Sequence, residues 1–422
     1  MTQGAIWTAI FEKFYTNTTE GPVRGAGKQA VLKRVQNSRA KLSGGDTSHS
    51  IEIPPRSKVV GSCQGFFQFQ YSWHDDTKAQ KDGVGVDRIV AWAHPVLRSL
   101  LRFEGLSWYI DGTFRCTPKG YKQCVTIMIY DPSSRLFIPT VFALTTSSTK
   151  PAYRRLLQCT QEMVGSPLSP KDAVCDFENS LIMAIREFFP TIRIIGCLFH
   201  FKQACRRKMK EYRLPDAETK LAMKASVFDV LTVVDPSKVA VEGIAWVKTE
   251  IRTRCSQKGI NYSRKKWTKF WKYFKRTWLV MYPPTYWNVY GISRAIVSRT
   301  NNPLERFHRV LNTRFPPHPS MNRFISTIEA LAREYVCQRE AIMAGLADPP
   351  KRRGFKLPRA PRLPNRSDII ASESSSSNDD SIDPCESCIG DFSWNSSTNE
   401  EEKEDSRPDY SFDYDHETQA VI

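Results

Sequence analysis

Three carboxylates in this 422-residue chain are spaced so that a folded protein could use them together. Asp111 lies near the end of a predicted strand at 107–114, Asp176 ends a predicted strand at 173–177, and Glu305 lies in a predicted helix. Neighbouring strands would bring both aspartates to one end of a sheet, and a later helix could carry Glu305 over them. Three carboxylates can hold two divalent ions about 3.5–4 Å apart, an arrangement that activates the nucleophile in phosphodiester chemistry.

Each carboxylate also has a simpler interpretation. Asp111 and Gly112 could form only a turn, Asp176 could cap a helix, and Glu305 could be a solvated helix residue. Glu178, two residues after Asp176, is its nearest competitor, and we assign it a supporting role beside the site. The elements that carry these side chains must decide between the interpretations.

Residues 107–213 alternate between strand and helix patterns. Their periodicity predicts strands at 107–114, 122–130, 137–145, 173–177 and 192–199, and helices at 151–163, 179–189 and 200–212. Three strands in an antiparallel meander followed by β-α-β crossovers make the ribonuclease-H-like mixed sheet of an α/β fold. Pro139 in the third strand predicts a sheet edge, because proline donates no backbone hydrogen bond.

The rest of the chain divides by composition and pattern. We expect a short helix and a basic arm or linker at 1–60, and a preparatory region at 61–106 with a strand near 66–71 and a helix at 87–103. The first part of the core at 107–213 is followed by a helical insertion at 214–299, and a closing catalytic helix and a C-terminal helix at 300–348. A basic, Pro-rich linker at 349–364 precedes an acidic, Ser-rich tail at 365–422 with the composition of a disordered segment.

Charge is distributed unevenly along the chain. It has 61 Lys and Arg against 44 Asp and Glu, a formal net charge of +17. Residues 365–422 contain 16 acidic and 3 basic residues, which leaves 58 basic and 28 acidic residues in 1–364, a net of +30. A body this basic indicates a polyanionic partner, with nucleic acid as the default candidate. The alternative is a basic protein kept soluble by its charge.

Composition also argues against a membrane partner and a disulfide framework. Asp131 and Arg135 interrupt the best apolar run, residues 125–144, so no segment is long enough to span a bilayer. Eleven scattered cysteines indicate a reducing compartment, cytosolic or nuclear.

Four motifs resemble those of the Mutator-like element (MULE) transposases, which have a DDE-type catalytic core. They are Tyr-Ile-Asp-Gly-Thr-Phe at 109–114, Cys-Asp-Phe-Glu at 175–178, Gly-Cys-Leu-Phe-His-Phe at 196–201 and Thr-Asn-Asn-Pro-Leu-Glu-Arg-Phe-His at 300–308. The resemblance implies that Asp111, Asp176 and Glu305 are catalytic and bind Mg²⁺ or Mn²⁺. It also implies metal-dependent DNA cleavage and strand transfer at element ends, with terminal inverted repeats and target DNA as double-stranded substrates, a homodimer and a nuclear location.

The spacing of the last two carboxylates fits the resemblance. Asp176 and Glu305 are 129 residues apart, whereas a bare core needs about 45 for one strand, two helices and their loops. The extra residues are mostly helical in pattern, and they resemble the α-helical insertion that these transposases carry before the final catalytic helix.

Cys197 and His200 form a Cys-x-x-His pair, which has metal-ligand spacing but supplies only two of the four ligands that structural zinc requires. Cys205 and His308 could complete a zinc site. The alternative, which we favour, is a structural or DNA-positioning role for Cys197, His200 and His308.

Two predicted helices carry clusters of basic residues, one at 200–212 and one at 263–281, and the second also carries a row of aromatic residues. Trp267, Phe270, Trp271, Phe274 and Trp278 recur at helical spacing and predict a buried stripe, although stacking on bases is the alternative. The candidates for contact with DNA phosphates are the cations on these two helices, namely Lys202, Arg206, Arg207, Lys265, Lys269 and Lys272. Lys351, Arg352 and Arg353 could form a nuclear localisation signal or a phosphate clamp.

The chain departs from the family at its N-terminal region. Many MULE transposases carry a zinc-binding module before the core, whereas residues 1–60 contain no cysteine and only His49. Another chain or the basic arm would then recognise the element ends. The alternative function is a catalytically inactive, host-adopted DNA-binding or regulatory protein derived from such a transposase.

Overall fold

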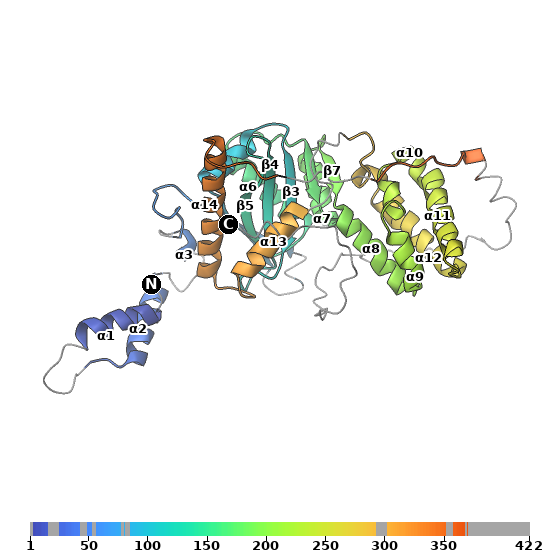
Figure 1. Ribbon diagram of the computed structural model, residues 1–422. Coiled ribbons are helices and arrows are strands. Elements are labelled where there is room, and N and C mark those ends of the chain that lie inside the picture. Colours follow the sequence, from blue (N-terminus) through green and yellow to red (C-terminus); the bar gives the residue numbers. More distant parts are fainter. Residues whose placement is uncertain are drawn as a thin grey trace. The chain divides into compact units, whose positions relative to one another are not determined.

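The computed structural model describes residues 3–15, 25–42, 49–52, 56–76, 80, 85–292, 302–351, 358–367 and 369. Within these residues a seven-stranded mixed sheet has the order β1-β2-β5-β4-β3-β6-β7 (Figure 1). The strands are β1 (Phe67–His74), β2 (Val86–Trp92), β3 (Ser107–Thr113), β4 (Gln123–Asp131), β5 (Leu136–Thr145), β6 (Asp172–Cys175) and β7 (Arg193–Gly196). The fold is therefore α/β with a mixed sheet, as the sequence predicted.

The five strands from β3 to β7 follow the predicted topology. β3, β4 and β5 pair as an antiparallel meander, and β6 and β7 are added parallel to β3. The crossovers contain α6 (Lys150–Val164) and α7 (Asn179–Phe188), which contact each other. α6 begins with Pro151 in its first turn, where a missing backbone donor costs nothing, and ends at Gly165 with φ +71°.

The beginning of the predicted helix at 87–103 is a strand instead. Val86–Trp92 forms β2, which pairs antiparallel with β1 and β5, and only at Pro95 does α5 (Pro95–Ser99) begin, followed by η1 (Leu100–Arg102). Ile89 to Trp92 are completely buried. A strand covered on both faces has a continuous apolar run without a period of two, which a helix pattern matches equally well.

Pro139 lies in an interior strand and not at the edge of the sheet. β5 pairs with both β2 and β4, but β2 reaches only Phe142–Thr145. Opposite Pro139, on β4, the register shifts between Ile127 and Met128. β2 therefore does not pair with β5 at Pro139. This explains how the sheet accommodates a residue that has no backbone N–H to donate.

Two long helices cover the sheet after the insertion. α13 (Asn302–Arg314) contacts β3 and crosses in front of the sheet in Figure 1, whereas α14 (Met321–Met343) contacts β5 and α5 and runs upright beside the strands. Both helices predicted between residues 300 and 348 are present, with Pro303 in the first turn of α13 and Gly345, at φ +71°, just after the end of α14.

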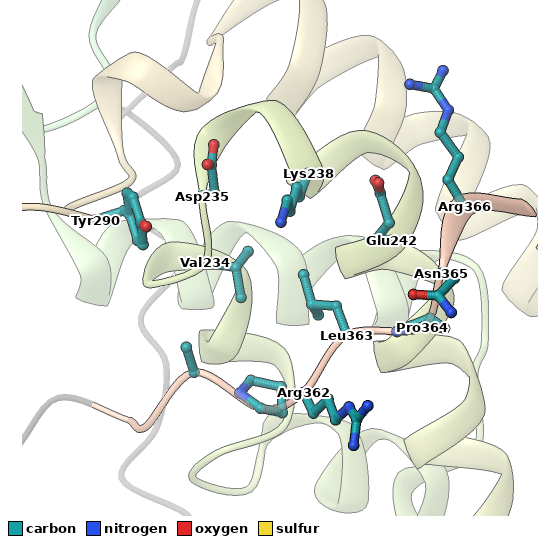
Figure 2. Close-up of a pocket in the computed structure, with 12 residues that line it drawn as sticks. Val234, Asp235, Lys238, Glu242, Tyr290, Arg362, Leu363, Pro364, Asn365 and Arg366 are labelled. Atoms are coloured by element: carbon teal, nitrogen blue, oxygen red, sulfur yellow. The ribbon is translucent and has the colours of Figure 1, made fainter.

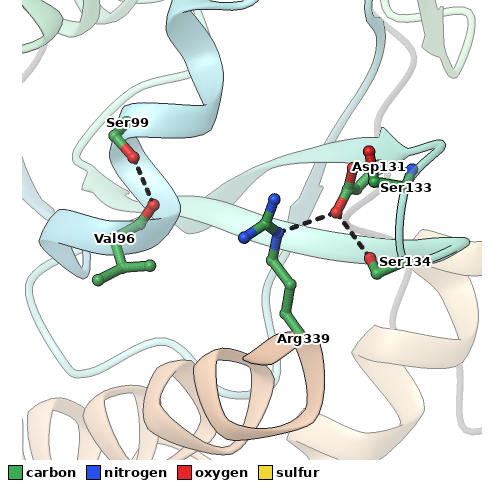
Figure 3. Close-up of polar contacts among 6 residues, drawn as sticks. All are labelled: Val96, Ser99, Asp131, Ser133, Ser134 and Arg339. Atoms are coloured by element: carbon green, nitrogen blue, oxygen red, sulfur yellow. Dashed lines mark hydrogen bonds and ion pairs between the residues drawn. The ribbon is translucent and has the colours of Figure 1, made fainter. Parts of the chain in front are cut away.

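Arg339 ties α14 to the turn between β4 and β5 (Figure 3). Its Nε donates a hydrogen bond of 2.9 Å to Asp131 Oδ2, which also accepts one of 2.7 Å from Ser134 Oγ. The Ser133 backbone N–H donates to Asp131 Oδ1 at 3.1 Å. Burial raises the pKa of Asp131, but these three hydrogen bonds outweigh it and hold the pKa below its usual value.

The segment at 214–299 is mostly helical where the structure describes it. It continues from α8 (Leu198–Glu211) through α9 (Asp216–Met223), η2 (Phe228–Thr232), α10 (Pro236–Lys238), η3 (Val239–Gly243), α11 (Ile244–Gln257), α12 (Arg264–Phe274), the π-helical turn η4 (Lys275–Met281) and η5 (Pro284–Tyr286). The five aromatic residues of the predicted stripe, from Trp267 to Trp278, are all buried. The stripe is thus the core of this segment, as expected, and is not available to bases.

Part of the Pro-rich linker lies against these helices. Leu363 packs on the core, and residues 360–366 enclose a pocket of about 410 Å³ with Asp235, Lys238, Glu242 and Tyr290 (Figure 2). Side chains of both charges line the pocket, and none of the three candidate carboxylates is among its lining residues. Arg352–Arg353 and residues 371–422, which include most of the acidic tail, lie outside the described residues.

The N-terminal region contains more helix than predicted. α1 (Gln3–Phe14) is confirmed, but the expected basic arm forms α2 (Lys28–Leu42), which contacts α1, and a short α3 (His49–Glu52) follows. α2 carries many polar residues, and its amphipathic pattern is too weak for the sequence to predict a helix there. None of the described helices has the length and apolar character needed to cross a bilayer.

Candidate active site

Asp111 lies on β3, which pairs antiparallel with β4 and parallel with β6. It is paired with Thr126 across β4, and it is buried, with 8% of its surface exposed. Its Oδ1 accepts a hydrogen bond of 2.9 Å from the Gly112 backbone N–H, which fixes the carboxylate. A Cβ atom at Gly112 would lie 2.3 Å from Gln123 Oε1, so any other residue here would force the Gln123 side chain to shift.

Asp176 lies beside Asp111 because of the strand register. Ile110 pairs with Cys175 across the parallel strands β3 and β6, so the next residue on each strand is an aspartate. Both carboxylates therefore lie at the carboxyl ends of adjacent strands, as the sequence predicted. Asp176 Oδ1 accepts a hydrogen bond of 3.1 Å from the Glu178 backbone N–H. Burial raises the pKa of Asp176, and the charge of His200 opposes this increase.

A buried hydrogen-bond chain supports Glu178, and sequence reasoning missed two of its members. Gln123 Nε2 donates to the Tyr153 hydroxyl at 2.7 Å, and this hydroxyl donates to Glu178 Oε2 at 2.8 Å. Burial, followed by the charge of Asp176, raises the pKa of Glu178 to about 7. Glu178 is thus held by α6 and β4 beside Asp176. Gln123 and Tyr153 lie outside the family motifs, so only the fold reveals their role.

Cys197 and His200 lie at the start of α8, which follows β7. Cys197 is fully buried, and its backbone N–H donates to the Cys175 carbonyl oxygen at 3.0 Å. This hydrogen bond places the first turn of α8 next to the strand end that carries Asp176. Cys205 is buried further along the same helix, and burial raises its pKa well above the usual value.

His308 lies over Asp111. Its Nδ1 is 3.8 Å from Asp111 Oδ2, and the side chains are only 12% and 11% exposed. Burial, and then the nearby His200, lower the pKa of His308 to about 4. The structure therefore brings His200 and His308 together with the two aspartates, although they come from α8 and α13.

Glu305 lies one helical turn before His308 on α13. Residues three apart share one side of a helix, so position 305 and His308 lie on the same side. Leu304 and Phe307 are buried, and Phe307 contacts Phe142 of β5 with ring centroids 6.0 Å apart, which fixes the rotation of α13 over the sheet. The side chain of Glu305 lies outside the described part of the structure.

The donor set can be compared with the needs of a divalent ion. Asp111 and Asp176 supply the carboxylate oxygens that Mg²⁺ and Mn²⁺ prefer, on adjacent strand ends. Burial of Asp176 without full compensation raises its pKa, and a cation beside it would relieve that cost. Among the described side chains, no group of three or more His, Cys, Asp and Glu is arranged to hold a metal ion. A third carboxylate would have to come from Glu305.

A comparison with protein families decides the class of this segment. Residues 107–204 match the family model of the MULE transposase domain. The chain carries a MULE transposase domain. No curated protein matches the chain. The MULE domain includes both aspartates, Cys197 and His200, whereas Glu305 and His308 come from α13, beyond the matched residues.

The six candidate DNA-contacting cations are exposed or half-buried. Lys265, Lys269 and Lys272 are exposed on α12, and Arg207 on α8 is exposed while Arg206 is half-buried. Lys202 differs, because its ammonium lies 3.9 Å from Asp229 Oδ2 and burial lowers its pKa. Its charge is therefore already matched within the protein, at the end of the MULE domain.

Proposed function

We propose that this chain is a DNA transposase of the MULE type, which cleaves DNA strands at element ends and joins them to target DNA with the help of Mg²⁺ or Mn²⁺. The observation that carries the proposal is the adjacency of Asp111 and Asp176 at the ends of β3 and β6, inside the matched MULE transposase domain. The strand order β5-β4-β3-β6-β7 supports a ribonuclease-H-like core.

Asp111, Asp176 and Glu305 would hold the metal ions. Ions bound there supply Lewis-acid activation of the attacking oxygen and stabilisation of the leaving oxygen. The protein contributes the fixed orientation of the carboxylates. The Gly112 backbone N–H binds one carboxylate oxygen of Asp111, and the Glu178 backbone N–H binds one carboxylate oxygen of Asp176. Each hydrogen bond fixes the orientation of its carboxylate and so the direction of the second oxygen.

The remaining parts of the proposal follow from this chemistry. Double-stranded DNA would be held by exposed cations such as Lys265, Lys269 and Lys272, which contact phosphates without reading sequence. Cleavage of two element ends calls for two copies of the chain, so we propose a homodimer. The DNA substrate calls for a nuclear location.

A strand-cleavage assay tests the proposal. Wild-type protein should nick and join terminal-repeat DNA with Mg²⁺ or Mn²⁺ and not with EDTA. Asp111→Asn should lower the rate about 100-fold or more, because it removes a metal-binding charge, while DNA binding measured by gel shift stays unchanged. Asp216→Asn is the matched control, since Asp216 is exposed in the first turn of α9 and should leave the rate unaltered.

Two outcomes would contradict the proposal. Folded wild-type protein that binds DNA but neither cleaves nor joins it with either metal would indicate the host-adopted DNA-binding alternative. Cleavage that survives Asp111→Asn would place the chemistry elsewhere in the chain.

A further inference from the structure

An exposed aromatic ring lies directly beside the candidate active site. Phe199, the second residue of α8, is 48% exposed, whereas Phe201 in the same turn is fully buried. The helix begins after Cys197, whose backbone N–H is bonded to Cys175, the residue before Asp176. The phenyl ring is therefore only a helical turn away from the strand end that carries a candidate metal-binding carboxylate.

The ring of His200 contacts the ring of Phe199. Their centroids are 5.6 Å apart and their planes are inclined by 65°, an edge-on contact. His200 is close enough to Asp176 and to His308 to affect the pKa of both. Phe199 is thus attached to the side-chain cluster around the aspartates, while about half of its surface faces solvent.

The solvent side of α8 is otherwise polar and basic. Residues 199, 203, 206, 207 and 210 lie on one side by helical spacing. Arg207 and Lys210 are exposed, and Arg207 donates to Gln203 Oε1 at 2.9 Å. The opposite side packs into the core through the buried residues Phe201, Ala204, Cys205 and Met209. Among the described residues, Phe199 contacts the ring of His200 but does not pack against the hydrophobic core, so an exposed phenylalanine lies on an otherwise basic helix face.

We propose that Phe199 stacks on an unpaired DNA base next to the scissile phosphate, while the cations of α8 contact the flanking phosphates. The inference rests on the proposed function, because it assumes that the strand lies over Asp111 and Asp176. Aromatic rings bind bases of any sequence by stacking, and positive charges beside them follow the backbone. The basic face of α8 matches such a ligand in charge, which favours an unpaired nucleotide over an apolar protein segment.

A binding experiment with two DNA probes tests this role. Fluorescein-labelled fully paired duplex and the same duplex with a short unpaired arm are titrated by anisotropy with full-length protein carrying Asp111→Asn, which prevents cleavage. The parent protein should bind the forked DNA more tightly. Phe199→Ala and Phe199→Leu should weaken forked-DNA binding about 5- to 100-fold, the effect of one lost base stack, and leave duplex binding unchanged. Phe199→Trp should keep the preference.

Phe103→Ala is the matched control, because Phe103 is 60% exposed at the end of η1 and outside the candidate site. Equal affinity of the parent and Phe199→Ala for forked DNA would overturn the proposal. An equal loss for forked and paired DNA would also overturn it, as would undiminished forked-DNA affinity of Phe199→Leu, which would indicate an apolar contact. A fork preference that depends on Phe199 in a wild-type protein without cleavage activity would support stacking and reject only the proposed transposase function.

Discussion

His308 Nδ1, on α13, lies 3.8 Å from Asp111 Oδ2, on β3. The two residues are 197 positions apart in the sequence. The distance is longer than a hydrogen bond, and the imidazole is neutral at pH 7 because its pKa is lowered to about 4. The contact nevertheless brings the helix that carries Glu305 to the strand that carries Asp111.

The neutral state of His308 predicts a pH dependence of stability. The folded-state pKa of about 4 lies below the usual value of 6.5, so the unfolded state binds more protons between these values. The free energy of unfolding should fall as the pH decreases from 6.5 to 4, by about 2 kcal/mol at pH 5 for this residue alone. Urea denaturation in EDTA at pH 7 and pH 5 measures it, and His308→Gln should remove this part of the change. An identical pH change in His308→Gln would show that the imidazole is not buried in the neutral form.

The Tyr153 hydroxyl should matter for both stability and cleavage. Tyr153→Phe removes the donor to Glu178 and the acceptor for Gln123, and it leaves buried polar groups unsatisfied. We expect a loss of about 1–3 kcal/mol in the free energy of unfolding and a lower cleavage rate at temperatures where the protein is fully folded. Tyr290→Phe, at a tyrosine that is 55% exposed, should change stability by about 0.5 kcal/mol or less. Wild-type stability and cleavage in Tyr153→Phe would exclude a role for this hydrogen-bond chain.

Glu218 should be essential for the helical segment. Its buried carboxylate accepts hydrogen bonds from Ser263 Oγ at 2.6 Å, the Ser263 backbone N–H at 3.1 Å and Trp267 Nε1 at 2.6 Å. Glu218→Ala removes the acceptor of all three hydrogen bonds and leaves the buried Trp267 Nε1–H and the Ser263 donors unsatisfied, so we expect unfolding to become easier by about 2–4 kcal/mol in urea denaturation.

Glu250→Ala is the control for Glu218→Ala. Glu250 forms an i,i+4 ion pair with Arg254 on the partly exposed side of α11, which should contribute about 0.5 kcal/mol or less. Equal effects of the two substitutions would mean that the Glu218 hydrogen bonds do not hold α9 to α12.

The Asp131–Arg339 ion pair should be coupled more strongly than an exposed one. A double-mutant cycle with Asp131→Asn and Arg339→Gln should give a coupling free energy of about 1–3 kcal/mol. The same cycle for Arg314 and Glu334, which are more exposed, should give about 1 kcal/mol or less. The pKa of Asp131 is lowered in the folded state, so its contribution is complete above the unfolded pKa and disappears as the pH falls through the folded one. Coupling no larger than that of the exposed pair would count against a structural role for this contact.

The order of elements from β3 to β7 could be predicted because local chemistry determines it. Strands rich in β-formers, proline in the first turn of α6 and asparagine with proline at the start of α13 are short-range signals, and they gave β3 to β7 and the flanking helices correctly. β2 was misassigned because a strand buried on both faces has no distinguishing period, and α2 was missed because its apolar residues are few.

The sequence by itself determined which residues could form the site: Asp111 and Asp176 near strand ends and Glu305 on a helix, within motifs that resemble those of the MULE transposases. Only the tertiary structure decided which side chains meet there. The parallel register of β3 and β6 makes the aspartates neighbours, and the packing of α13 brings His308 to Asp111 across 197 residues. The roles proposed for Gln123, Tyr153 and Phe199 rest on the tertiary structure in the same way, because burial, hydrogen-bond partners and exposure depend on residues that are distant in the chain.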